Sequence, residues 1–214
     1  MEILTHLINI VLHLDEHILA AIHDYGTWTY LILFVIIFCE TGLVVTPFLP
    51  GDSLLFVIGA VSATGSLSVE IAIGVLFTAA VLGNTVNYWI GHFLAAKVFR
   101  PEYARILKPE YLEATQKFFN KYGGKAIIIT RFVPIIRTFT PFMAGVGRMN
   151  FWRFSLYNFA GGALWVLSLV LAGFFFGNIP FIRKNLTAAT FVIIFISFLP
   201  GVWEYWQHKK SVTK

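Results

Sequence analysis

Arg131 and Arg137 lie in a stretch of sequence that is otherwise as apolar as a membrane span. The stretch ends at Gly145 and also contains Pro134 and Pro141. Because proline interrupts helices, we expect a hairpin that enters the membrane and turns back, not a continuous span. Arginine at membrane depth is costly unless an anionic group meets it. The stretch is therefore a candidate site for binding an anion.

Two carboxylates belong to a second predicted hairpin, nearer the N-terminus. Glu40 and Asp52 flank a tip that contains Pro47, Pro50 and Gly51. The apolar run after Asp52 is about ten residues long, which as a helix reaches only about half of a bilayer. We therefore predict a second re-entrant hairpin. A purely structural alternative is that these carboxylates cap helix ends.

The four charges could act together if the two hairpins meet. Burial of opposite charges in one cavity lowers the cost of each. Arg131 and Arg137 would then bind a phosphate, because a guanidinium group presents several donors in one plane. Glu40 is our candidate for proton binding, together with Asp52, because burial favours the protonated carboxyl group. The alternative is an ion pair that only locks the hairpins together.

The composition is that of a membrane protein. Of the 214 residues, 57% are hydrophobic and 13% are charged, and the mean hydropathy is +0.75. These values predict an all-α polytopic membrane protein. The net charge is +5, but no Lys or Arg precedes Lys97, and basic residues crowd the segment from Lys97 to Lys125. The positive-inside bias therefore predicts that this segment and the C-terminus are cytoplasmic.

Polarity divides the chain into three predicted parts. Residues 1–24 are expected to form an amphipathic interfacial helix, residues 25–208 a transmembrane domain and residues 209–214 a cytoplasmic tail. Within the transmembrane domain we predict re-entrant hairpins at about 27–66 and 126–147, and spans at about 69–96, 153–178 and 187–206. The last span is an extra C-terminal helix.

A short pattern recurs in the two hairpins. Thr-Pro-Phe-x-x-Gly occurs at Thr46–Gly51 and at Thr140–Gly145, an offset of 140 minus 46, or 94 residues. At the same offset Gly83-Asn84 corresponds to Gly177-Asn178. We therefore predict an inverted repeat of hairpin plus span, which is the plan of many secondary transporters.

Two amides, Asn84 and Asn87, lie within the span that follows the first hairpin. Amides inside a span more often bond a neighbouring helix than a ligand. We therefore predict that both residues support the site without binding the substrate.

Common catalytic and cofactor-binding motifs do not occur in the sequence. It has no Gly-x-Ser-x-Gly, no Walker loop and no His-Glu-x-x-His, and Cys39 is its single cysteine. We therefore expect no enzyme, no metal and no cofactor. Nucleic acid is not an expected partner, because the basic residues flank spans. A lipid phosphatase is a remote alternative, in which Glu40 or Asp52 would act as the base.

These motifs resemble those of the DedA family of bacterial inner-membrane proteins, whose VTT domain is shared with eukaryotic lipid scramblases. The resemblance rests on Glu40 followed by Phe-Leu-Pro-Gly-Asp52, and on Arg131-Phe-x-Pro-x-x-Arg137-x-x-x-Pro141-x-x-Ala144-Gly145. It extends from about Leu14 to His208 and is greatest for the DedA subgroup. Two positions differ, since many relatives carry Asp in place of Asn84 and Gly-Arg in place of Gly91-His92.

The resemblance implies a lipid transporter that is linked to the proton-motive force, with undecaprenyl phosphate and phosphatidylethanolamine as the lipids attributed to members. It also implies that Glu40, Asp52, Arg131 and Arg137 are the functional charges. We therefore expect a flippase whose partners are a phosphate-bearing lipid and protons, with self-association left open. The alternatives are a proton-coupled ion or drug antiporter, and an assembly protein in which the charges form only a latch.

Overall fold

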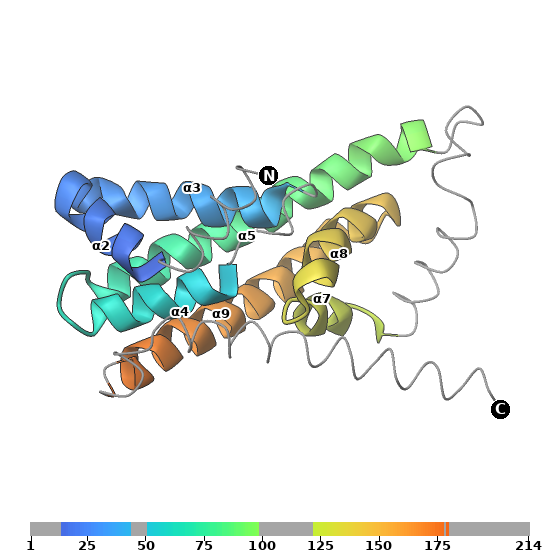
Figure 1. Cartoon of the computed structure of the whole chain (residues 1–214). Coiled ribbons are helices and arrows are strands. Elements are labelled where there is room, and N and C mark those ends of the chain that lie inside the picture. Colours follow the sequence, from blue (N-terminus) through green and yellow to red (C-terminus); the bar gives the residue numbers. More distant parts are fainter. Residues whose placement is uncertain (1–13, 44–50, 99–121, 178, 180–214) are drawn as a thin grey trace, which may run out of the picture. The chain divides into compact units, whose positions relative to one another are not determined.

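The computed structural model describes residues 14–43, 51–98, 122–177 and 179, and the regular elements in these ranges are all helical (Figure 1). They are α2 (Leu14–Tyr25), η1 (Gly26–Trp28), α3 (Thr29–Gly42), α4 (Gly51–Ser62), α5 (Val69–Val98), α7 (Lys125–Thr130), α8 (Pro134–Val146) and α9 (Phe151–Phe176). The predicted all-α class is confirmed for these residues. Outside them lie residues 1–13 of the predicted interfacial helix, Pro47 and Pro50, most of the basic segment, the span predicted at 187–206 and the tail at 209–214.

Three of the described segments are long and apolar enough to cross a membrane: Ala20–Gly42, Val69–Ala95 and Phe151–Phe176. The last two agree with the spans predicted at about 69–96 and 153–178. The first differs from the sequence prediction, which ends an interfacial helix at residue 24 and treats the rest as one arm of a hairpin. Helical structure continues across this boundary through η1, so the apolar segment is longer than its sequence pattern indicates.

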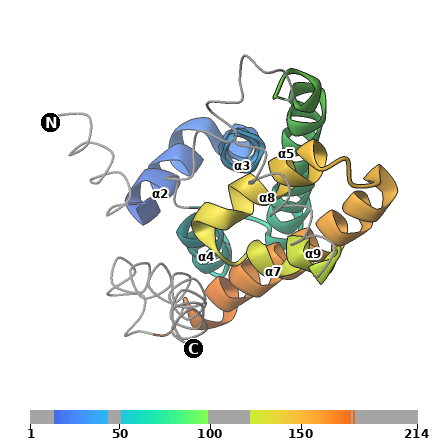
Figure 2. The same ribbon diagram turned by 90° about the vertical axis from the view of Figure 1, so that its right-hand side faces the viewer.

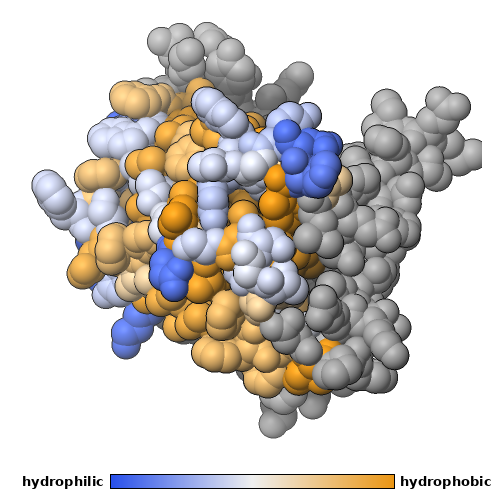
Figure 3. All heavy atoms as spheres, turned by 90° about the vertical axis from the view of Figure 1, so that its left-hand side faces the viewer, coloured by the Kyte–Doolittle hydropathy of each residue, from blue (hydrophilic) through white to orange (hydrophobic). Residues whose placement is uncertain are grey.

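Large apolar side chains are exposed along α5 and α9. Examples are Phe93 on α5, which is 69% exposed, and Trp152 on α9, which is 80% exposed. Figure 3 shows that apolar residues supply much of the visible surface on one face of the molecule. Such side chains are unfavourable in water but are suited to contact with lipid. Together with the three long apolar helices, they define a membrane protein.

The chain forms two compact units. The first comprises Met1–Ile36, Phe48–Phe77 and Val166–Lys214, and the second comprises Ile37–Pro47 and Thr78–Trp165. In the first unit, α4 packs against α2 and is buried along its whole length. Its 12 residues extend about 18 Å, which is less than the roughly 30 Å of a bilayer core. Helix α4 is therefore too short to span a membrane by itself.

In the second unit, α7 and α8 pack against each other on either side of a break (Figures 1 and 2). The break includes Arg131 and ends at Val133, whose backbone is extended. Pro134 follows at the start of α8, where its missing N–H costs no helical bond.

The sequence prediction also placed Pro141 and Gly145 at the tip of the hairpin expected at about 126–147, and the structure corrects their position. Both residues lie inside α8, which continues through Pro141. A proline within a helix removes one backbone hydrogen bond but does not have to end the helix. Gly145 has a packing role instead, because a β-carbon there would overlap the backbone oxygen of Tyr88 on α5.

Of the first copy of the recurring Thr-Pro-Phe-x-x-Gly pattern, only Gly51 is among the described residues. The final glycine of the pattern begins α4 in the first copy, Gly51, but lies near the end of α8 in the second, Gly145. The two glycines thus lie at different places in their helices, and the repeat at a spacing of 94 residues (140 minus 46) stays a prediction. The inverted topology itself stays a prediction.

Candidate functional site

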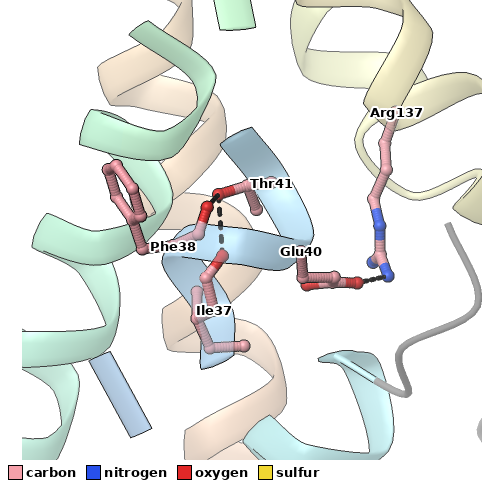
Figure 4. A network of polar contacts seen from close by, with 5 residues as sticks. All are labelled: Ile37, Phe38, Glu40, Thr41 and Arg137. Carbon is pink, nitrogen blue, oxygen red and sulfur yellow. Dashed lines mark hydrogen bonds and ion pairs between the residues drawn. The ribbon is translucent and has the colours of Figure 1, made fainter. Parts of the chain in front are cut away.

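Glu40 of α3 and Arg137 of α8 form an ion pair in the second unit. Nη2 of Arg137 donates a hydrogen bond to Oε1 of Glu40, and Figure 4 shows the two side chains extending toward each other. Both are buried, with Glu40 0% and Arg137 6% exposed. Each charge offsets the cost of burying the other. The structure thus brings together one carboxylate and one arginine that the sequence placed in different hairpins.

The end of α3 that carries Glu40 is held against α5. The hydroxyl group of Thr41 donates to the backbone oxygen of Ile37 at 2.8 Å (Figure 4). Gly83 of α5 faces this turn, and a β-carbon there would overlap Oγ1 of Thr41 and lie 2.9 Å from the backbone oxygen of Phe38. The absence of a side chain at Gly83 therefore permits the close approach of the two helices.

Asn87 of α5 links the backbones beside the two paired charges. Its Nδ2 donates to the backbone oxygen of Thr41 at 3.1 Å and to that of Thr138 at 2.8 Å. Thr41 follows Glu40 in the chain and Thr138 follows Arg137. The amide thus connects α3 and α8 through α5, next to the ion pair.

Arg131 lies in the break between α7 and α8 and is 3% exposed. Its Nη1 donates to Oδ1 of Asn158 at 2.9 Å, and its Nη2 donates to the backbone oxygen of Ala80 at 3.2 Å. These acceptors are neutral, and no described carboxylate forms an ion pair with Arg131. Arg131 and Arg137 are therefore held in different ways.

Asn158 of α9 was not identified as a site residue from the sequence. Its Oδ1 also accepts a hydrogen bond from Nδ2 of Asn84 at 3.1 Å. Its Nδ2 donates to the backbone oxygen of Val81 at 3.0 Å and contacts Oγ1 of Thr85 at 3.4 Å. The available signal was an amide inside an apolar span, the same signal that singled out Asn84 and Asn87.

Both arginines face one tryptophan. The Cζ atoms of Arg131 and Arg137 lie 5.4 and 5.1 Å from the centroid of the Trp165 ring, which is buried in α9. These distances are within the range of cation–π attraction. Trp165 was missed in the sequence because a tryptophan in an apolar span gives no sign of what it contacts. Arg131 and Arg137 therefore lie at the same aromatic ring.

Asp52 belongs to the other compact unit, where it is buried in the first turn of α4. The site described here therefore contains Glu40, Arg131 and Arg137 from the predicted set of four charges. The prediction that Asp52 shares their cavity stays a prediction.

Two buried arginines in one site could bind an anion. Arg137 already binds a carboxylate, and another anion could replace that carboxylate. Arg131 is a buried cation that neutral oxygens hold in place. Apolar helices of membrane-spanning length with ionisable groups buried among them define an integral membrane protein with an internal polar site.

Comparison with known proteins gives the family. Residues 49–175 match the VTT domain. The whole chain is 47% identical to Protein DedA of Escherichia coli strain K12 and covers 99% of that protein. It is 36% identical to the Inner membrane protein YqjA of the same strain, over 86% of this chain and 83% of the relative. It is 41% identical to an uncharacterized membrane protein of Mycobacterium tuberculosis H37Rv, over 79% and 75%.

The comparison with solved structures gave no match. The chain belongs to the DedA family of VTT-domain membrane proteins.

Proposed function

We propose that this protein is a carrier that moves a phosphate-bearing lipid, such as undecaprenyl phosphate or phosphatidylethanolamine, across the bacterial inner membrane. In this proposal Arg131 and Arg137 bind the phosphate group, while the acyl or prenyl tail stays in the bilayer. The protein then needs to enclose only the head group. No covalent bond is made or broken, so the proposal assigns no catalytic residue.

The observation that carries the proposal is the pair of buried guanidinium groups at the ring of Trp165. Guanidinium groups match the oxygens of a phosphate in geometry and charge, and their attraction for an anion is stronger away from water. Ionisable groups buried in membrane proteins usually serve function. The name of the relative YqjA, an inner membrane protein, supports the proposed location.

Glu40 provides a means of coupling anion binding to protons. Its carboxylate and the phosphate would both bind Arg137, so the two anions compete for the same guanidinium group. A proton bound to Glu40 removes its negative charge and frees Arg137 for the phosphate, and loss of that proton reverses the exchange. Asp52, which is buried at the start of α4, is the second proton-binding group in this proposal.

Proteoliposomes would test the proposal. Labelled undecaprenyl phosphate and labelled phospholipids are followed with and without a pH gradient. We expect lipid movement that the gradient accelerates, and initial rates at least about tenfold lower in R131A and R137A, because each loses charge-assisted hydrogen bonds. R153A is the matched control, since Arg153 is an exposed arginine in the first turn of α9 and its variant should keep the wild-type rate.

Other outcomes would point to the alternatives. Cation flux driven by the gradient without lipid movement would indicate an antiporter. Folded protein with neither activity would indicate a structural latch. Wild-type lipid movement in R131A and R137A would show that these arginines do not bind the phosphate.

A further inference from the structure

We infer that Asn158 is a positioning residue that holds one edge of the Arg131 guanidinium group and so presents the opposite edge to the phosphate. The inference rests on the proposed function and adds to it a residue that touches Arg131 and not the lipid. The inference also assigns different roles to the two arginines. Arg131 is the permanent anchor for the anion, whereas Arg137 is shared with Glu40.

The first argument is the distribution of the Arg131 hydrogen bonds. A guanidinium group has five N–H donors. Nη1 donates to Asn158, to Oδ1 at 2.9 Å and to the backbone oxygen at 3.5 Å, and Nη2 donates to Ala80. Nε is buried and has no hydrogen-bond partner among the described residues. Nε and Nη2 form one of the edges through which arginine makes paired hydrogen bonds to a phosphate or carboxylate.

The second argument is charge. The oxygens that orient Arg131 belong to amides, so they fix the direction of the guanidinium group without neutralising it. A buried cation with an unpartnered N–H is unfavourable until an anion fills the vacant direction. A carboxylate in the place of the Asn158 amide would supply that anion from within the protein.

The third argument is that Asn158 is itself held in place. Its Oδ1 accepts from Asn84 as well as from Arg131, and its Nδ2 donates to the backbone oxygen of Val81. A rotation of the side chain that exchanged Oδ1 and Nδ2 would lose these hydrogen bonds. The oxygen therefore stays directed at Arg131, and α5 sets the position of the guanidinium group through α9.

The ligand class that fits this edge is an anion with two oxygens on one atom, such as a phosphomonoester. A lipid head group and free phosphate share this chemistry. Decyl phosphate and inorganic phosphate are therefore used as separate probes, and decanol serves as the uncharged control for the alkyl chain.

The experiment measures the thermal unfolding of the full-length protein in detergent at increasing probe concentration. Decyl phosphate should raise the melting temperature of the wild type, since binding to the folded state stabilises it. In N158D the carboxylate still faces Arg131 but pairs with its charge. N158D loses the hydrogen bond to the backbone oxygen of Val81, but the new ion pair with Arg131 offsets that loss. We therefore expect a ligand-free melting temperature close to that of the wild type, together with affinity for decyl phosphate at least about tenfold lower. A merely structural role would not lower affinity at unchanged stability.

N158L and T85V complete the series. N158L removes the oxygen that holds Arg131 and should also bind decyl phosphate at least about tenfold more weakly; it serves in place of N158D if that variant does not fold. Thr85 contacts Nδ2 of Asn158 at 3.4 Å and makes no hydrogen bond to Arg131. T85V should therefore keep the affinity of the wild type.

The outcomes separate the inference from the proposed function. If decyl phosphate does not stabilise the wild type, phosphate binding fails and the inference fails with it. If the wild type is stabilised and the Asn158 variants bind equally well, only the inference is overturned. It is also overturned if T85V loses as much affinity as N158L. Equal stabilisation by inorganic and decyl phosphate, with loss in N158D, would support the role of Asn158 but replace the lipid by free phosphate.

Discussion

Glu40 and Arg137 are 97 residues apart in the chain and form an ion pair that is buried between α3 and α8. A buried pair adds little stability compared with apolar residues of the same volume, but losing one partner leaves an isolated charge. The two side chains are therefore strongly coupled. In the proposed mechanism, protonation of Glu40 makes Arg137 available to another anion.

This coupling can be measured by a double-mutant cycle. We expect E40A and R137A each to lower the free energy of unfolding by about 3–5 kcal/mol, because each removes one partner of a buried ion pair. The double variant E40A/R137A should lose clearly less than the sum of the two, since neither charge remains. Chemical unfolding in detergent gives the four values. Losses that simply add would show that the pair is not coupled, and R153A controls for removing an exposed arginine.

The aromatic ring of Trp165 should contribute to stability beyond the volume that the side chain fills. W165F keeps an aromatic face for Arg131 and Arg137, whereas W165L does not. We expect W165L to be less stable than W165F by about 1–2 kcal/mol, because cation–π attraction to two guanidinium groups is lost. W165L should also bind decyl phosphate more weakly. Equal stability and equal affinity in the two variants would rule out a cation–π role.

Gly83 and Gly74 offer a matched comparison within α5. A β-carbon at Gly83 would overlap Oγ1 of Thr41, while one at Gly74 would meet nothing within 4 Å. We expect G83A to lower the free energy of unfolding by about 1–3 kcal/mol, because α3 and α5 must move apart. It should also slow lipid movement by displacing Glu40. G74A should be neutral or more stable by up to about 1 kcal/mol, since alanine favours helix. Wild-type stability in G83A would argue against the close approach.

Substitutions at Asn87 test the direction of its hydrogen bonds. Its Nδ2 donates to the backbone oxygens of Thr41 and Thr138, so an aspartate there would direct an oxygen at two acceptors. N87L loses the same bonds without adding a repulsive contact and is the matched control. We expect N87L to lose about 1–3 kcal/mol of stability and N87D to lose more. If N87D is the more stable variant at neutral pH, the amide is oriented the other way.

Parts of the fold and of the site could be predicted because their signals are local. Hydropathy and helix length indicated α5 and α9, and isolated charges in apolar sequence indicated Glu40, Arg131 and Arg137. Other features depend on which residues of other helices the folded chain brings into contact. Local sequence patterns do not indicate these contacts. Pro141 continues α8, and the first long apolar segment extends past the predicted boundary at residue 24. Asn158 and Trp165 looked like ordinary residues of a span.

The sequence by itself determined that this protein lies in a membrane. It also determined which side chains are costly to bury there. Transfer from water to an apolar medium is a property of each side chain, so it can be read residue by residue. Only the tertiary structure decided that Arg137 pairs with Glu40 while Arg131 is held by the neutral amide of Asn158. Electrostatic pairing depends on distances of a few ångströms between helices, and the packing of those helices sets the distances.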